Sequence, residues 1–185
     1  MGCKAAIHRL SLQVSDLDRG YFRGHELTVA RHPSETERRM MLRILLFAMH
    51  AHERLAFTRG VSTVDEPDLW QHDLAGDIEC WIELGQPDGK RIRHALGRAR
   101  RVFVYTTGGQ AADVWWDRQG GRFMTLKRLA VTAIGEADAD ALAALCARNM
   151  SLQCVIQDGE IWIGDSRRDV RILPAVRKPM GDAAS

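Results

Sequence analysis

The segment from Asp77 to Leu84 constrains the fold more than any other, because its apolar residues recur at every second position. That spacing is typical of a strand with one buried face. Apolar residues at helical spacing follow from Ile92 to Ala99, and a β-branched and aromatic run from Val102 to Thr106 predicts a second strand. A strand, a helix and a strand in this order predict a right-handed crossover between parallel strands. The pattern therefore indicates an α/β fold.

Antiparallel hairpins are expected on both sides of this crossover. Alternation from His8 to Val14 predicts a strand that returns over Leu27 to Ala30. Near the other end, Asp158-Gly159 separates two short apolar alternations and is a strong hairpin signal. We therefore expect one mixed sheet, in which a βαβ crossover is flanked by antiparallel hairpins, and a frayed tail after residue 174.

The clearest helix signal begins at Ser34, a candidate N-cap with Glu37 three residues later. Its apolar stripe is wide enough to predict burial on most sides, and Gly60 is expected to end it. Further helices are expected from Gln110 to Asp117 and around Ala139 to Cys146.

Composition limits the classes of protein to which the chain can belong. A chain of 185 residues without a Gly/Ser/Pro-rich linker predicts a single domain over 1–185. Its longest apolar run, Ile44 to Met49, is far shorter than the roughly 20 residues of a membrane helix, so no membrane partner is expected. Four cysteines without a CxxC pair favour a reduced, cytoplasmic protein. A net charge of +2 does not by itself indicate a nucleic-acid-binding protein.

The most informative chemical feature is the acidic side of the strand at 77–84. Its polar positions carry carboxylates and no basic residue, and hard divalent cations such as Mg²⁺ and Mn²⁺ prefer such oxygens. The strand alone spaces its acids too widely for a compact site, so a carboxylate from another element is needed. The alternative is a solvated sheet face. The candidate metal ligands are Asp65, Asp68, Asp77, Glu79 and Glu83, and Glu35 is a further carboxylate that is also explained by the dipole of the first helix.

A basic helix follows the acidic strand directly. Lys90, Arg91 and Arg93 lie at its start, where they could contact the phosphates of a nucleic acid. An acidic strand beside a basic helix suits metal-dependent phosphoester chemistry, with Glu83 and Arg91 as the catalytic candidates. The alternative is a solvated helix face whose cations favour solubility.

Several stretches of the sequence resemble the YaeQ family, and together they span nearly the whole chain. The most specific is Trp81-Ile82-Glu83-Leu84-Gly85 with Pro87-Asp88 and Arg91-Ile92. The others are Leu27 to Thr36, Glu53 to Gly60, Asp65 to Pro67, and Ile156 to Gly159 with Ile161-Trp162. The resemblance implies a variant of the PD-(D/E)XK nuclease fold, and a fold does not establish an activity.

The sequence departs from the nuclease signature where that signature has a lysine. Pro67-Asp68 matches its first half, but Asp77-Ile78-Glu79 has Glu and Glu83-Leu84-Gly85 has Gly at the lysine position. Lys90 or Arg91 could supply the missing charge. An arginine there would position or stabilise the phosphate, because it holds its proton too firmly to act as a general base.

Three hypotheses follow. The first is a Mg²⁺- or Mn²⁺-dependent phosphodiesterase acting on nucleic acid. The second is a non-catalytic module that binds nucleic acid or protein on a degenerate nuclease-like scaffold. The third is a phosphatase or nucleotide hydrolase with a small substrate. The sequence leaves the oligomeric state open.

Overall fold

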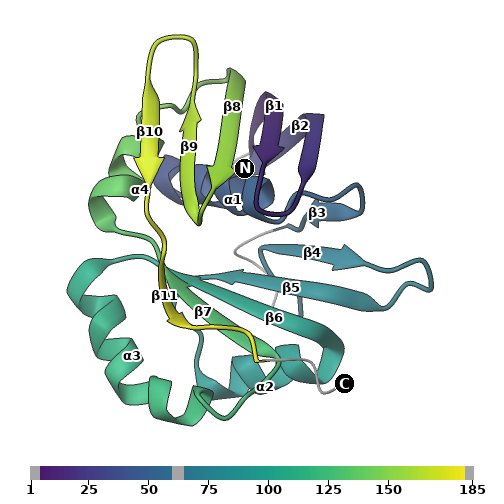
Figure 1. Ribbon diagram of the computed structural model, residues 1–185, viewed down its shortest axis with the longest axis vertical. Helices are drawn as coiled ribbons and strands as arrows, with labels where there is room; N and C mark the ends of the chain where they lie inside the picture. Colours follow the sequence, from purple (N-terminus) through teal and green to yellow (C-terminus); the bar gives the residue numbers. More distant parts are fainter. Residues whose placement is uncertain (1–4, 60–64, 182–185) are drawn as a thin grey trace.

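The computed structural model describes residues 5–59 and 65–181, and these residues form two sheets and four helices (Figure 1). The strands are β1 (Ala6–Asp16), β2 (Tyr21–Arg31), β3 (Leu55–Phe57), β4 (Leu69–His72), β5 (Ile78–Leu84), β6 (Ala99–Thr106), β7 (Leu129–Ala133), β8 (Asn149–Gln157), β9 (Glu160–Gly164), β10 (Asp169–Ile172) and β11 (Ala175–Lys178). The helices are α1 (Glu37–Met49), α2 (Gly89–Arg98), α3 (Gly109–Phe123) and α4 (Glu136–Ala143).

The expectation of one mixed sheet is wrong, because the strands form two. One has the order β10-β9-β8-β1-β2, and the other has the order β11-β7-β6-β5-β4-β3. Each sheet is mixed, since β1 runs parallel to β8 in the first and β6 runs parallel to β5 and β7 in the second. The α/β class is confirmed.

The crossover predicted from the acidic strand is confirmed. Strands β5 and β6 are parallel neighbours and α2 connects them. The carboxylate of Asp88 begins α2 by accepting the backbone N–H of Arg91 at 2.7 Å. This geometry brings the start of α2 close to the end of β5, where Glu83 lies.

Both predicted hairpins form, but residues 175–178 of the tail that was expected to fray are ordered in a strand. Strand β2 is longer than predicted, and β8 and β9 are joined at Asp158-Gly159. Residues 175–178 form β11, which pairs with β7 and is itself an edge strand of the six-stranded sheet. Lys178 secures this strand, since its buried Nζ donates to the carbonyl oxygen of Leu129 at 2.6 Å. In a segment this short and polar, the sequence gives little signal that the backbone will pair at the edge of a sheet.

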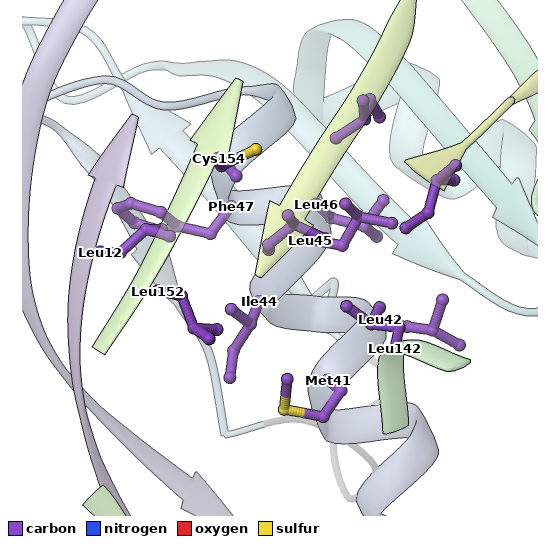
Figure 2. Packing of buried hydrophobic residues seen from close by; sticks show 14 of the residues in the cluster. Leu12, Met41, Leu42, Ile44, Leu45, Leu46, Phe47, Leu142, Leu152 and Cys154 are labelled. Atoms are coloured by element: carbon purple, nitrogen blue, oxygen red, sulfur yellow. The ribbon is translucent and has the colours of Figure 1, made fainter. Parts of the chain in front are cut away.

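Helix α1 lies between the two sheets and is buried on all sides. Nine consecutive residues, Met40 to Ala48, are buried, which confirms the predicted wide stripe. Leu12, Leu152 and Cys154 of the five-stranded sheet pack on one side of α1, as Figure 2 shows. Side chains of the six-stranded sheet, including Ile82 and Leu84 of β5, belong to the same core. Helix α4 adds Leu142 to it.

The ends of three helices differ from the prediction. Helix α1 begins after Thr36, whose hydroxyl accepts the N–H of Arg39, and not after Ser34. It ends at His50, and the expected end at Gly60 lies outside the described residues. Helix α3 runs six residues beyond the predicted Asp117, and α4 starts three residues before Ala139.

Helices α2 and α3 cover the face of the six-stranded sheet that points away from α1 (Figure 1). Trp81 of β5 is fully buried there against Ile92 and Ala95 of α2, and Phe123 of α3 belongs to the same cluster. The six-stranded sheet is therefore covered on both faces. Within the described residues, no helix is long and apolar enough to span a bilayer.

The end of α1 is tied to β6 by a hydrogen bond of 2.7 Å between His50 Nε2 and the Tyr105 hydroxyl. Burial lowers the pKa of His50 to about 3, with Arg19 and Arg101 adding to the effect. The unfolded chain then binds a proton that the folded protein does not, so stability is lost as the pH falls below about 6.5.

We predict that lowering the pH from 6.5 to 4.5 decreases the free energy of unfolding of the wild type by about 1 kcal/mol per pH unit more than that of His50→Gln. Chemical denaturation at a series of pH values measures this difference. Parallel pH profiles for the two proteins would contradict the buried, neutral His50.

Candidate functional site

Asp68 lies directly before β4 and is buried, although aspartate is normally exposed. One carboxylate oxygen accepts the backbone N–H of Leu84 at 2.8 Å. The other accepts Arg39 Nη2 at 2.7 Å. Both oxygens are therefore hydrogen-bonded, and Asp68 links α1 to the ends of β4 and β5.

Glu83 lies near the end of β5 and is held in a similar way. Its oxygens accept Arg91 Nε at 3.1 Å and the indole N–H of Trp81 at 2.8 Å. The Arg91 guanidinium also lies 5.2 Å from the centre of a Trp81 ring, and its Nη2 donates to the carbonyl oxygen of Glu66 at 2.6 Å. Burial raises the pKa of Glu83, the hydrogen bonds from Trp81 and Arg91 lower it, and the charge of Asp68 raises it further. The net pKa of Glu83 is raised.

Sequence reasoning missed two arginines that complete this site. Arg39 Nη1 donates to Glu35 at 3.1 Å while its Nη2 holds Asp68, so one guanidinium bridges two carboxylates. Arg43 is almost fully buried, and its Nη1 lies 3.0 and 3.1 Å from the two oxygens of Glu35. Glu35, Arg39 and Arg43 are four residues apart, which is the spacing of neighbours on one helix face and was the available signal.

These contacts form two groups of ion pairs, which we call together the ion-pair cluster: Glu35, Arg39, Arg43 and Asp68 are linked to one another, and Glu83 pairs with Arg91. The two groups adjoin at Leu84, the neighbour of Glu83, whose backbone N–H donates to Asp68. The cluster lies where α1, β4, β5 and α2 meet. Three guanidinium groups neutralise three carboxylates, and such pairing is what makes the burial of charges tolerable.

The remaining candidate metal ligands lie apart from the cluster. Glu79 pairs with Arg101 at 3.1 Å, and the exposed Asp77 lies 3.6 Å from Arg100. Arg100 and Arg101 belong to the neighbouring strand β6, so the charges of Asp77 and Glu79 are neutralised by residues of another strand. The exposed Asp65 lies 3.7 Å from His94 and close to Arg98.

A bulge explains why the acids of β5 do not share one face. Gln71 of β4 pairs with Cys80, but the next residue, His72, pairs with Ile78, so Glu79 is an extra residue. A bulge interrupts the alternation of side chains. Among residues 5–59 and 65–181, no three His, Cys, Asp or Glu side chains form a group that could hold a metal.

Gly85 follows the end of β5, at one of the two positions, with Glu79, where a match to the nuclease signature would require a lysine. Gly85 has φ +134°, a conformation that residues with a Cβ rarely adopt, while nothing lies within 4 Å of its ideal Cβ. Conformation rather than space therefore favours glycine here. A lysine at 85 would strain the end of β5.

Lys90 and Arg93 project from the exposed side of α2. Neither contacts an acidic side chain in the described part of the chain, unlike Arg91, which belongs to the cluster. The three predicted phosphate-binding residues thus divide into one that is committed to Glu83 and two that are exposed.

We predict that Asp68→Ala lowers the free energy of unfolding by about 3 kcal/mol, because it leaves the Leu84 N–H and Arg39 without their buried acceptor. The matched control, Asp77→Ala, removes an exposed carboxylate and should cost less than about 0.5 kcal/mol. Urea denaturation at neutral pH measures both, and equal losses would contradict the structural role of Asp68.

Comparison with known proteins gives a consistent result for the whole chain. The family model described as YaeQ protein matches residues 1–174. The YaeQ protein of Escherichia coli (strain K12) is 40% identical over 180 residues, covering 97% of this chain and 99% of its own. The crystal structure of the YaeQ protein from Xanthomonas axonopodis pv. citri superposes with a TM-score of 0.91 at 44% identity, over 94% of this chain and 98% of that one. The crystal structure of the YaeQ protein from Pseudomonas syringae superposes with a TM-score of 0.90 at 32% identity, over 95% of this chain and 97% of that one. The chain belongs to the YaeQ family.

Proposed function

We propose that this protein binds nucleic acid through the phosphate backbone, without cutting it, on a degenerate PD-(D/E)XK-like scaffold. The observation that carries the proposal is a contrast between two neighbouring groups of charges. All four carboxylate oxygens of Asp68 and Glu83 already accept hydrogen bonds, whereas nearby cations on the helical layer contact no acid in the described ranges.

These cations form what we call the basic surface: Lys90, Arg93, Arg118, Arg122 and Lys127. They belong to α2, α3 and the turn after α3, which share one core beneath them. The indole N–H of Trp115 in α3 donates to the carbonyl oxygen of Pro87, which fixes α3 beside the start of α2. Both Arg93 and Gln119 lie within 4 Å of the ideal Cβ position of Gly89, so Arg93 is close to the helical turn that carries Arg118 and Arg122. Exposed cations without acidic partners are suited to neutralise phosphates.

The scaffold part of the proposal is supported by the order of elements. Helix α1, the antiparallel strands β3, β4 and β5, helix α2 and the parallel strand β6 follow one another, with Asp68 at the start of β4 and Glu83 in β5. In this arrangement, the acids that a nuclease would use are the acids that the arginines bind. A hard cation would have to displace Arg39 or Arg91, and breaking such a buried pair costs about 3–5 kcal/mol.

We predict that the protein binds a short DNA or RNA duplex with an affinity that falls as salt rises, and that Lys90→Gln/Arg93→Gln reduces the slope of log K against log [salt] by about 2. Fluorescence anisotropy at several salt concentrations measures the slope. The control, Arg9→Gln/Arg167→Gln, removes two exposed cations elsewhere and should leave the slope unchanged. Binding that is absent, or equally weakened by both double variants, would refute the basic surface.

A second candidate is the Mg²⁺- or Mn²⁺-dependent phosphodiesterase, and one observation favours it. Arg39 is partly exposed and bridges Glu35 and Asp68, so a cation already lies between two acids, of which Asp68 accepts the N–H of Leu84, the neighbour of Glu83. The residues as they are arranged do not offer a free set of ligands, and the primary proposal therefore assigns the cluster to stability.

Incubation of the protein with oligonucleotides and with mononucleotides, in the presence of Mg²⁺ or Mn²⁺, separates these candidates. We expect binding without hydrolysis. Metal-dependent cleavage of oligonucleotides that is lost in Glu83→Gln but kept in Asp77→Asn would establish the phosphodiesterase instead. Hydrolysis of mononucleotides alone would identify an enzyme with a small substrate.

A further inference from the structure

A cavity of about 540 Å³ opens between the two sheets, and none of its lining residues belongs to the ion-pair cluster or the basic surface. Its lining comes from the turn after β1, the β8–β9 turn, one residue each of β6 and β7, and the segment from Leu173 to Val176. That volume lies within the range of sites for small organic ligands, roughly 300–1,000 Å³.

The charge of the cavity is strongly negative. Four carboxylates line it, those of Asp16, Asp18, Asp158 and Glu160, against the guanidinium of Arg19. Arg19 is committed to the buried Asp16, because its Nε and its backbone N–H both donate to that carboxylate, the latter at 3.0 Å. The charges of Asp16 and Arg19 therefore cancel.

The other three acids have different partners. The two oxygens of Asp18 accept the backbone N–H groups of Asp158 and Gly159 at 2.7 and 2.9 Å, which holds the two turns together. Glu160 is bound by Arg171 from outside the cavity. Within residues 5–59 and 65–181, the carboxylate of Asp158 contacts no cation and accepts no hydrogen bond, so its charge remains available.

Most of the remaining wall is apolar, with Met49, Ile156 and Ile161 from α1, β8 and β9, and Leu173, Pro174 and Val176 near the C-terminal strand β11, while Thr132 adds a hydroxyl group. Leu173 and Val176 are 51% and 65% exposed, which is high for apolar side chains beside a cavity. Tyr105 adds an aromatic ring whose hydroxyl is hydrogen-bonded to His50, and an aromatic face attracts cations.

We propose that this cavity binds a small organic ammonium ion, an amine with an apolar body, whose charged head lies against Asp158 and whose body packs on the rim formed by Leu173 and Val176. Charge complementarity selects the cation, because an anion would meet the carboxylates of Asp18 and Asp158, which pair with no cation in the described residues, while Arg19 is bound to Asp16 and Arg171 to Glu160. The apolar rim selects an amine that carries a hydrocarbon chain over a bare metal ion. The inference does not depend on nucleic-acid binding, since the two sites share no residue.

The test compares two probes of nearly the same shape, 3-phenylpropan-1-amine and 3-phenylpropan-1-ol, by isothermal titration calorimetry at neutral pH. We expect the ammonium form to bind about tenfold more tightly than the alcohol, a difference of about 1.4 kcal/mol, because it alone can form an ion pair with Asp158. Asp158→Asn should abolish this difference. The substitution suits the site because Asp158 has φ +53°, which asparagine also adopts.

The control variant is Asp117→Asn, which removes an exposed carboxylate on α3 and should leave the preference for the amine unchanged. Amide chemical shifts in a titration with the amine should move around Asp158, Tyr105 and Val176. Equal affinity for the two probes, an unchanged preference in Asp158→Asn, shifts confined to other regions, or no binding up to the solubility limit of the amine would each overturn the proposal.

Discussion

The burial of α1 on all sides is the constraint from which the rest of the structure follows. A helix between two sheets must present apolar residues in every direction, and Met40 to Ala48 do so with one exception. Arg43 is that exception, and a buried guanidinium requires a carboxylate nearby. Glu35, which lies just before the helix, supplies this carboxylate, and Arg39, one turn before Arg43 on α1, pairs with Asp68. The cluster is therefore the polar counterpart of the core that Figure 2 shows.

The need to pair the charges around the buried helix α1 explains why carboxylates that resemble a nuclease signature are bound by arginines. Arg39 and Arg43 reach the site from α1, and Arg91 reaches it from α2, so the carboxylates at the ends of β4 and β5 are approached from both faces of the sheet. Each arginine also contacts a backbone carbonyl or an aromatic ring, which fixes its guanidinium group. Planar guanidinium groups that are held at several points suit a structural ion pair better than the mobile lysine of a catalytic site.

Local sequence patterns predicted the helices and strands well. They did not predict which strands pair with one another or which side chains meet across them. The crossover from β5 through α2 to β6 followed from a change of period within thirty residues, and Asp158-Gly159 identified its hairpin. The division into two sheets depends on the pairing of β1 with β8, about 140 residues away, and no local pattern encodes that pairing. Similarly, the acids of β5 were visible, but the bulge at Glu79 and the arginines opposite it were not. Glu35, Arg39 and Arg43 could have been recognised, because their spacing of four residues is a property of the sequence alone.

The arrangement of charges, rather than their number, separates the possible roles of this chain. A net charge of +2 hides three regions of different character: a neutral cluster inside, a basic surface on α2 and α3, and an acidic cavity between the sheets. The first two adjoin along α2, because the cluster lies at the ends of the central strands of the six-stranded sheet and the basic surface lies on the helices that cover one face of it. Ion pairs that are saturated on folding contribute stability and are not available for ligands. The sites that we propose therefore use charged groups without an ion-pair partner in residues 5–59 and 65–181, namely the cations of the helical layer and the carboxylate of Asp158.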